Sequence, residues 1–217
     1  MQVFKFTNGS PEWLHKRRQY LTATEVASLF GLNPYKSANK LIKSKLIPEP
    51  PFDSIHMRAG RIFESSVFMD LRERGIIAKQ PGDGNVVMIA HDTVKISASL
   101  DGYIISEEGN HIVEAKTTIE KIREWDSNPP IAYILQVQTQ LMISGYKSGI
   151  LACLSLTAPF PGIGYEIQPN KIIHDLILEE TNRFWNCLEN NKNFVVHQPS
   201  KRIILQHIYD GIELLYN

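Results

Sequence analysis

The sequence lacks several features that mark large classes of protein. Its 217 residues contain two cysteines, Cys153 and Cys187, which lie in apolar segments and do not have the spacing of a metal site. This usage favours a reduced protein in which both thiols pack in the core. No apolar run is long enough to span a bilayer, so we expect no membrane partner. We therefore expect an intracellular location, in a bacterial cytoplasm, a phage or viral context, or a host nucleus.

Charge of one sign is also missing. Lys and Arg number 23 and so do Asp and Glu, which gives no net charge and no global basic field for nucleic acid. The sequence has no Gly-rich phosphate loop and no motif that supports Ser-His-Asp chemistry. DNA binding therefore has to depend on local clusters, such as Lys16-Arg17-Arg18 with the neighbouring His15.

The residues that are present predict one α/β (α+β) domain over 1–217, with a core over about 12–190 and a C-terminal arm over 191–217. The predicted helices cover 22–31, 37–45, 58–75, 128–144, 170–189 and 201–215. The predicted strands cover 76–78, 86–89, 94–105, 111–117, 147–156 and 164–168. Loops are predicted at 48–51 and 81–85, and a capping box of Thr22 with Glu25 opens the first helix.

The helix predicted at 58–75 carries a carboxylate where a core residue is expected. Phe63, Val67, Phe68 and Leu71 form its apolar stripe, and Glu64 falls in the middle of that stripe. A carboxylate there needs a cation or hydrogen bonds as compensation. Pairing with a nearby arginine and service as a metal or active-site carboxylate are equally compatible with this position.

Two predicted strands around a turn at 107–110 form a hairpin. With a four-residue loop, Asp101 lies opposite Lys116 and Tyr103 lies opposite Glu114. Residues two apart share a strand face, so Asp101, Glu114 and Lys116 converge on one side of the ladder. A slip of one residue would move Asp101 to the other face.

Two carboxylates beside an ammonium suit metal-assisted attack on a phosphodiester. Mg²⁺ takes carboxylate oxygens and keeps several waters, and such a water can become the nucleophile. The lysine would help deprotonate that water or hold the phosphate. The alternative interpretation is a salt-bridged surface hairpin, since a Glu-x-Lys pattern is common.

The helix predicted at 128–144 has a polar side. Tyr133, Gln136 and Gln140 follow each other at helical spacing opposite the apolar stripe, while Gln138 points into that stripe. Simple solvation explains most glutamine-rich faces. The alternative is that these side chains line a polar cleft.

These motifs together resemble those of a known family. The motifs are Arg17 seven residues before Thr24 in Ala23-Thr24-Glu25, Gly60-x-x-x-Glu64, Ser99-Leu100-Asp101-Gly102, Glu114-Ala115-Lys116 and Tyr133-x-x-Gln136-x-Gln138. In this order, over roughly residues 12 to 155, they resemble the lambda-exonuclease and YqaJ-type viral recombinase family of the PD-(D/E)xK nuclease superfamily. Thr24 replaces a serine and Leu100 a proline of the family pattern, and the Gln-x-x-x-Tyr signature of RecB-type and Cas4-type relatives is missing.

The resemblance implies a restriction-endonuclease-like core, with a central mixed β-sheet flanked by helices. It also implies two Mg²⁺ ions, for which Mn²⁺ would substitute. Their ligands would be Glu64, Asp101, Glu114 and the carbonyl of Ala115, with Lys116 at the attacking water.

The resemblance further implies 5′-to-3′ digestion of one strand of duplex DNA, which leaves a 3′ overhang for a single-strand-annealing partner, and a homotrimeric ring. In such an enzyme Arg17 and Thr24 would hold the terminal 5′-phosphate, although the sequence alone does not decide between Arg17 and Arg18. Ser99, Tyr133 and Gln136 would contact DNA. An endonuclease or nickase on the same core, or a non-catalytic DNA-binding relative, remain alternatives.

Overall fold

The computed structural model describes residues 1–47, 54–82, 85–119, 122–125 and 128–217. The strands are β1 (Gln2–Thr7), β2 (Leu21–Thr22), β3 (Asn85–Ala90), β4 (Ile96–Leu100), β5 (Gly102–Ile104), β6 (His111–Thr118), β7 (Ser148–Ser155), β8 (Gly162–Ile167) and β9 (Ile212–Tyr216). The α-helices are α1 (Pro11–Arg18), α2 (Ala38–Leu46), α3 (Ile55–Glu73), α4 (Ile131–Ser144), α5 (Lys171–Glu189) and α6 (Gln198–His207). Two short 3-10 helices are η1 (Ala23–Ser28) and η2 (Ile122–Trp125).

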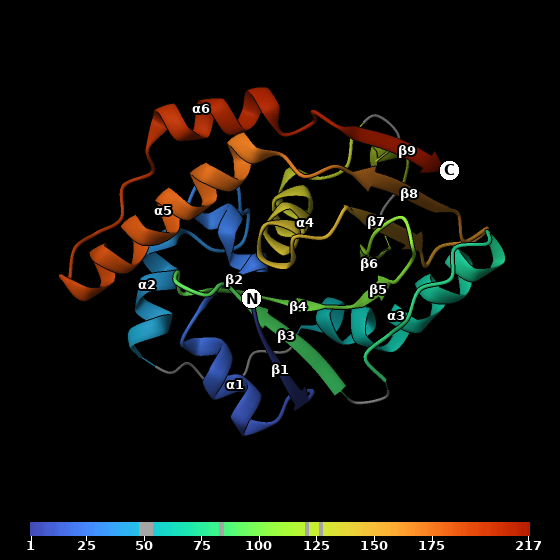
Figure 1. Cartoon of the computed structure of the whole chain (residues 1–217), viewed down its shortest axis with the longest axis horizontal. Coiled ribbons are helices and arrows are strands. Elements are labelled where there is room, and N and C mark those ends of the chain that lie inside the picture. The colour runs from blue at the N-terminus through green and yellow to red at the C-terminus, as the bar shows by residue number, and fades with distance from the viewer. Residues whose placement is uncertain (48–53, 83–84, 120–121, 126–127) are drawn as a thin grey trace.

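Two mixed sheets, flanked by helices, form the scaffold (Figure 1). One sheet has the strand order β1-β3-β4-β2 and the other β5-β6-β7-β8-β9. Within them β3 and β4 are antiparallel, whereas β6 and β7 are parallel. The mixed α/β class is confirmed, but the single central sheet that was expected is divided in two. In the part of the chain that is described, no helix combines the length and apolar character needed to cross a membrane.

The division falls at Asp101. The strand predicted over 94–105 ends as β4 at Leu100 and resumes as β5 at Gly102, so Asp101 lies at the junction of the two sheets. A Cβ atom on Gly102 would lie 2.5 Å from Cε1 of Phe68, so glycine is what lets α3 pack directly against this junction. Glu64 lies one helical turn before Phe68 and shares its side of α3, which brings this carboxylate toward Asp101.

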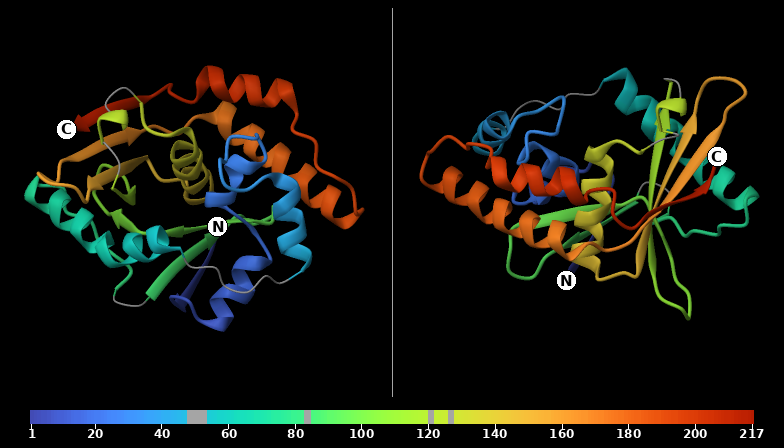
Figure 2. Two further views of the ribbon diagram at one scale, coloured as in Figure 1. Left: turned by 180° about the vertical axis from the view of Figure 1, so that it is seen from behind. Right: turned by 90° about the horizontal axis from the view of Figure 1, so that it is seen from above.

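Helices cover both faces of the second sheet (Figure 2). On one face Val67, Phe68 and Leu71 of α3 pack with Val113 and its neighbours on β7. On the other face the core contains Ile112 of β6 together with residues of α4. Because side chains alternate along a strand, Glu114 and Lys116 follow Ile112 onto the α4 face. Ala115 follows Val113 onto the α3 face.

The predicted hairpin forms with a different register. Tyr103 pairs with Ile112, and Ile104 pairs with His111, so the loop is two residues longer than expected and Asp101 is not opposite Lys116. The prediction was wrong in register but right about the shared face. A slip of two residues restores the original face because the side-chain period of a strand is two.

Four predicted helices are confirmed with small shifts, at α2, α3, α4 and α5. The capping box is present, with the Glu25 carboxylate accepting a hydrogen bond from the Thr22 backbone N–H at 2.9 Å, but it opens the 3-10 helix η1 rather than an α-helix. Phe63, predicted to lie in the core, is 42 % exposed. Cys153 is buried as expected, and burial raises its pKa to about 12.

The remaining differences concern strands. Residues 76–78 form no strand, and only Lys79 makes a bridge, to Tyr103. The helix predicted over 201–215 ends at His207, and β9 follows and pairs antiparallel with β8. The C-terminal arm therefore adds an edge strand to the second sheet. The strand β1 was not predicted. The loop predicted at 48–51 and the centre of that at 81–85 lie outside the described residues.

Candidate active site

Glu114 is the centre of the site. Its side chain is 1 % exposed and receives three hydrogen-bond donors. The Oε1 atom accepts from the Lys116 ammonium and from Nε2 of Gln136 at 2.6 Å, while Oε2 accepts from Nε2 of Gln140 at 2.5 Å. A buried carboxylate is tolerated when it is paired and hydrogen-bonded in this way. The position of Glu114 is therefore fixed by β6 and α4 together.

Asp101 faces Glu114 from the junction of the two sheets. Its Oδ2 accepts a hydrogen bond from the backbone N–H of Ala115 at 3.0 Å. Burial and the charge of Glu114 raise the pKa of Asp101 well above its usual range, although Lys116 opposes the shift. The two carboxylates thus stand close enough for each charge to act on the other.

Lys116 supplies the cation of the site. Burial disfavours its charge, but Glu114 and Asp101 outweigh burial and raise the pKa of Lys116 above its ordinary value. The side chain is 20 % exposed, and Nζ lies 5.0 Å from the ring centroid of Tyr133. Lys116 is therefore an ammonium at neutral pH that remains within reach of a bound molecule.

Glu64 on α3 belongs to the same group. Burial and then Glu114 raise its pKa, and Lys116 lowers it. Glu64 therefore lies within electrostatic reach of Glu114 and Lys116, and Asp101 is affected by all three of these charges.

The donor chemistry of this group fits a hard divalent cation. All available ligands are carboxylate or carbonyl oxygens, which Mg²⁺ and Mn²⁺ prefer. Burial first, and then the charge of Glu114, raise the pKa values of Asp101 and Glu64, while Lys116 lowers both. Within the described residues, no three His, Cys, Asp or Glu side chains stand together as a ready metal-holding group. Binding an ion would require the carboxylates to approach one another.

The polar side of α4 faces this group and not solvent. Gln136 is 6 % exposed and Gln140 is 0 % exposed, so the solvation interpretation is wrong for both. Gln140 also donates to the backbone carbonyl of Ser99, at 3.2 Å, which links the site to β4. The sequence left open whether Gln140 is solvated or lines a polar cleft, and Gln140 was not selected as a site residue. Its i, i+4 spacing from Gln136 was the available signal.

Gln138, on the opposite side of α4, has a different role. Its Nε2 donates to the carbonyl of Gln168 at 2.8 Å, and its Oε1 accepts from the backbone N–H of Asn170 at 3.0 Å. Nε2 of His174 lies 2.8 Å from the same oxygen. Gln138 therefore ties α4 to the start of α5 and does not contact Glu114.

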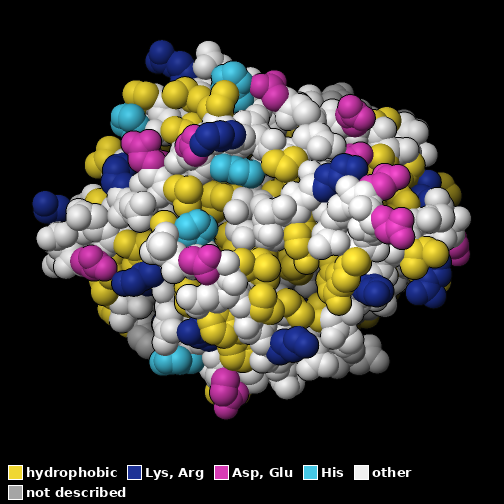
Figure 3. All heavy atoms as spheres, in the orientation of Figure 1, with side chains coloured by type: hydrophobic (Ala, Val, Ile, Leu, Met, Phe, Trp, Pro, Cys, Tyr) yellow, Lys and Arg dark blue, Asp and Glu magenta, His cyan; other side chains and the backbone are white. Residues whose placement is uncertain are grey.

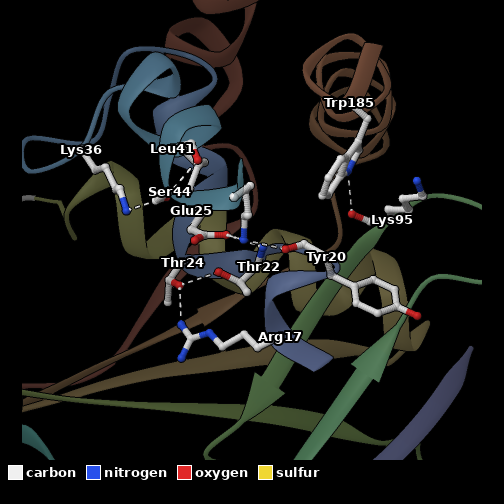
Figure 4. Close-up of polar contacts among 11 residues, drawn as sticks. Arg17, Tyr20, Thr22, Thr24, Glu25, Lys36, Leu41, Ser44, Lys95 and Trp185 are labelled. Carbon is white, nitrogen blue, oxygen red and sulfur yellow. Dashed lines mark hydrogen bonds and ion pairs between the residues drawn. The ribbon is translucent and has the colours of Figure 1, made fainter. Parts of the chain in front are cut away.

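A second polar cluster joins α1 to η1 (Figure 4). Nη2 of Arg17 donates to Oγ1 of Thr24 at 3.4 Å, and the guanidinium lies 5.1 Å from the ring centroid of Trp13. Arg18 is exposed on the other side, so Arg17 is the arginine that turns toward Thr24. Because η1 is a 3-10 helix of six residues, the anion-binding capacity of this cluster depends on its side chains.

The two clusters are close to each other. Tyr35 contributes to raising the pKa of Tyr133, which lies over Lys116 in the first cluster. Lys36, the neighbour of Tyr35 in sequence, and Arg17 both lower the pKa of Lys45, which pairs with Glu25 beside the second cluster. The helix η1 also packs against α4. The loop that contains Tyr35 and Lys36 therefore passes by both groups.

The sequence profile of the YqaJ-like viral recombinase domain matches residues 12–147. The chain belongs to this family. The YqaJ protein of Bacillus subtilis (strain 168), described as uncharacterized, is 28 % identical over 181 residues, which cover 81 % of this chain and 55 % of that protein. The chain thus spans about half the length of the curated relative it matches.

Solved structures show the same fold. An alkaline exonuclease, LHK-Exo from Laribacter hongkongensis, has a TM-score of 0.66 at 23 % identity, covering 84 % of this chain and 94 % of its own. The complex of LHK-Exo with dAMP has a TM-score of 0.64 at 21 % identity, with 91 % and 97 % covered. A phage-related exonuclease from Haemophilus somnus 129PT has a TM-score of 0.59 at 13 % identity, with 79 % and 96 % covered. This YqaJ-family chain therefore has the restriction-endonuclease-like fold of alkaline exonucleases.

The YqaJ-family match contains both polar clusters. Arg17 and Gln140 lie near its two ends, at residues 12 and 147, while β7, β8, β9, α5 and α6 lie beyond it. These segments support the sites from outside the match, since β7 pairs with β6 and α5 packs against α4.

Proposed function

We propose that this YqaJ-family chain is a metal-dependent deoxyribonuclease that digests one strand of linear duplex DNA from 5′ to 3′, leaving a 3′ overhang. The observation that supports the proposal is the environment of the buried Glu114 carboxylate, which Lys116, Gln136 and Gln140 hold and whose charge acts on Asp101 and Glu64. In a salt-bridged surface hairpin the carboxylate would be exposed, whereas the Glu114 side chain is 1 % exposed and accepts hydrogen bonds from two buried amides.

The proposed metal ligands are Glu64, Asp101, Glu114 and the carbonyl of Ala115, which would hold two Mg²⁺ ions or Mn²⁺ in their place. When bound, such an ion lowers the pKa of a water and neutralises charge that develops on phosphate. Side chains of the protein orient the groups that would bind the ion. Gln136 and Gln140 hold the Glu114 carboxylate in one orientation.

Lys116 had two possible roles, deprotonation of water or contact with the phosphate. The Lys116 ammonium already donates a hydrogen bond to Glu114, so we infer the second role, in which it acts through charge and hydrogen bonding. Lys116 would then hold a phosphate oxygen and orient the attacking water.

The polarity of digestion is proposed from the second cluster. Arg17 and Thr24 would hold a terminal 5′-phosphate, which carries more charge than an internal phosphodiester and suits a guanidinium with a neighbouring hydroxyl. Ser99, Tyr133 and Gln136 would line the path of the strand. Figure 3 shows Lys and Arg interspersed with Asp and Glu on the face it displays, so DNA attraction there depends on local clusters rather than on a broad field.

The solved relatives support a nuclease of this type. LHK-Exo is an alkaline exonuclease, and its complex contains dAMP, a deoxynucleotide of the kind released when DNA is digested from an end. A homotrimeric ring around the DNA and a single-strand-annealing protein as partner are further proposals that rest on the family resemblance. Light scattering of the purified chain tests the trimer.

The experiment compares linear and circular duplex DNA, each with Mg²⁺ and with excess EDTA, and linear DNA with 5′-phosphate or 5′-hydroxyl ends. We expect Mg²⁺-dependent release of nucleotides from linear DNA only, faster from 5′-phosphate ends. Cleavage in EDTA would contradict the metal proposal. Cleavage of circular DNA would identify an endonuclease or nickase instead, and binding without cleavage in Mg²⁺ or Mn²⁺ would identify a non-catalytic relative.

End recognition has its own matched control. Arg17→Ala should slow digestion of 5′-phosphate ends by at least about tenfold, the value of one charge-assisted hydrogen bond, and affect 5′-hydroxyl ends much less. Arg18→Ala removes the same charge from the neighbouring, exposed position and should leave the ratio of the two rates unchanged. Equal slowing on both ends by Arg17→Ala would mean that Arg17 is not an end sensor.

A further inference from the structure

A buried ion pair lies behind the Arg17–Thr24 contact. Nζ of Lys45, which α2 supplies, donates to Oε2 of Glu25 at 2.8 Å and to the carbonyl of Tyr20 at 2.7 Å. The Lys45 side chain is 6 % exposed and that of Glu25 is 23 % exposed. Lys45 therefore has almost no surface with which to contact DNA, and any influence on DNA has to pass through its partners.

Those partners lead directly to Thr24. The Oε2 atom of Glu25 that receives Lys45 also accepts the backbone N–H of Thr22, at 2.9 Å. The Oγ1 atoms of Thr22 and Thr24 are 3.0 Å apart, and Arg17 donates to Thr24 at 3.4 Å. Figure 4 shows the contacts that join Glu25 through Thr22 and Thr24 to the Arg17 guanidinium. One carboxylate oxygen thus links α2 to the segment that presents Thr24.

The same arrangement places an anion near Arg17. Burial lowers the pKa of Lys45, Glu25 opposes this, and the positive charges of Arg17 and Lys36 lower it further. Arg17 therefore lies within electrostatic reach of the Lys45–Glu25 pair. A carboxylate within electrostatic reach of a guanidinium competes with phosphate for it unless another cation holds the carboxylate.

We propose that Lys45 is a positioning residue for recognition of the DNA end: it holds Glu25 against Thr22, which keeps the Thr24 hydroxyl in place and leaves Arg17 available for a terminal 5′-phosphate. This inference rests on the proposed nuclease function and deepens it. Without Lys45, the Glu25 carboxylate is released and pairs with Arg17. The chain then loses its preference for 5′-phosphate ends while its cleavage site, on β6 and α4, is unaffected.

The test is the ratio of initial cleavage rates on 5′-phosphate and 5′-hydroxyl linear duplexes in Mg²⁺. Lys45→Met should lower this ratio about tenfold relative to wild type, the value of one charge-assisted hydrogen bond, and leave the 5′-hydroxyl rate within about twofold. Lys45→Met combined with Glu25→Gln should regain most of the ratio, because the competing carboxylate is gone. Lys43→Met, an exposed position on the same helix, removes the same charge and should match wild type.

Each outcome decides the matter. The proposal is overturned if a folded Lys45→Met protein keeps the wild-type ratio of rates. It is also overturned if Lys45→Met lowers the cleavage rates on both kinds of end equally and adding Glu25→Gln does not restore them, because Lys45 would then have only a structural role. If Lys45→Met does not fold, as judged by thermal melting, Lys45→Gln replaces it in the same comparison. If the wild-type chain does not cleave DNA, the proposed function itself is refuted. If both proteins cleave DNA and Lys45→Met has the same ratio of rates as wild type, only the role of Lys45 is refuted.

Discussion

Two buried glutamines on one helix allow a matched test of the site. Gln140 donates to the Glu114 carboxylate, whereas Gln138, on the opposite side of α4, bonds to the Gln168 carbonyl, the Asn170 backbone N–H and the His174 ring and not to Glu114. We predict that Gln140→Leu impairs both stability and cleavage, and that Gln138→Leu impairs stability alone. Leucine has a similar volume, so packing is largely retained in both variants.

The expected loss of stability in Gln140→Leu follows from the two polar atoms of the Gln140 side chain. Its Nε2 makes a hydrogen bond to a charged group, worth about 1.5–3 kcal/mol when a buried partner is left behind. Its own Oε1 is buried and has no hydrogen-bond partner among the described residues, so leucine also removes an unfavourable group. The net loss should therefore fall near the lower limit, about 1–2 kcal/mol, which is a fall in Tm of roughly 2–8 °C for a chain of this size.

The expected effect on cleavage is larger than the effect on folding. A Glu114 carboxylate that has lost one of its donors is free to turn away from Asp101 and Lys116. We expect the cleavage rate of Gln140→Leu to fall on the order of tenfold, measured well below the Tm, the value of one hydrogen bond made in the transition state.

The control is Gln138→Leu. It leaves the Asn170 N–H and the Gln168 carbonyl without their partner, so its Tm should fall at least as far. Its cleavage rate at the same temperature should remain within about twofold of wild type. Equal rates for the two variants, with both folded, would show that Gln140 is only a core residue and would refute the assignment of the α4 amides to the site.

Three further predictions concern single side chains. Lys116→Ala should reduce turnover at least about a hundredfold, because the contact of Lys116 matters mainly in the transition state. The Kd for DNA, measured by fluorescence anisotropy, should change little. Near-normal turnover would mean that the Glu114–Lys116 pair is only a salt bridge. Glu64→Gln should lower cleavage and raise the Mg²⁺ concentration needed for half-maximal rate, and full activity at low Mg²⁺ would make Glu64 a core residue only. Burial lowers the pKa of His174 to about 4 from an ordinary value of 6.5, so its neutral form stabilises the fold above pH 6.5 and this contribution is lost as the pH falls to 4. Partial exposure limits the loss in free energy of unfolding to about 1–3 kcal/mol. In His174→Gln, the free energy of unfolding measured in urea should depend less on pH between these values. An unchanged pH dependence would exclude His174 as the cause.

Local interactions made several features predictable from the sequence. The Thr22–Glu25 capping box and the stop at Gly75, which has a φ of 82°, involve residues only a few positions apart. The common face of Asp101, Glu114 and Lys116 also followed from the sequence, since a two-residue error in register leaves side-chain direction unchanged. The order of the family motifs was likewise a property of the sequence, and the family match confirmed it.

The polar side of α4 was decided only by the tertiary structure. Periodicity identifies an apolar stripe but does not show what covers the other side of a helix. Here α4 is enclosed by η1, α5 and the second sheet, so Gln136 and Gln140 meet a carboxylate where an isolated helix would meet water. The nearest sequence signal was their spacing of four residues.

Long-range packing decided the rest of the site. The break between β4 and β5 at Asp101 depends on the close approach of Phe68 to Gly102, and these residues are distant in sequence. The choice of Arg17 over Arg18 depends on where η1 lies relative to α1, and β9 forms because β8 offers it an open edge. The sequence by itself therefore determined which residues are chemically equipped and which strand face they share, whereas burial and partner choice arose from contacts between distant segments, which local propensity does not encode.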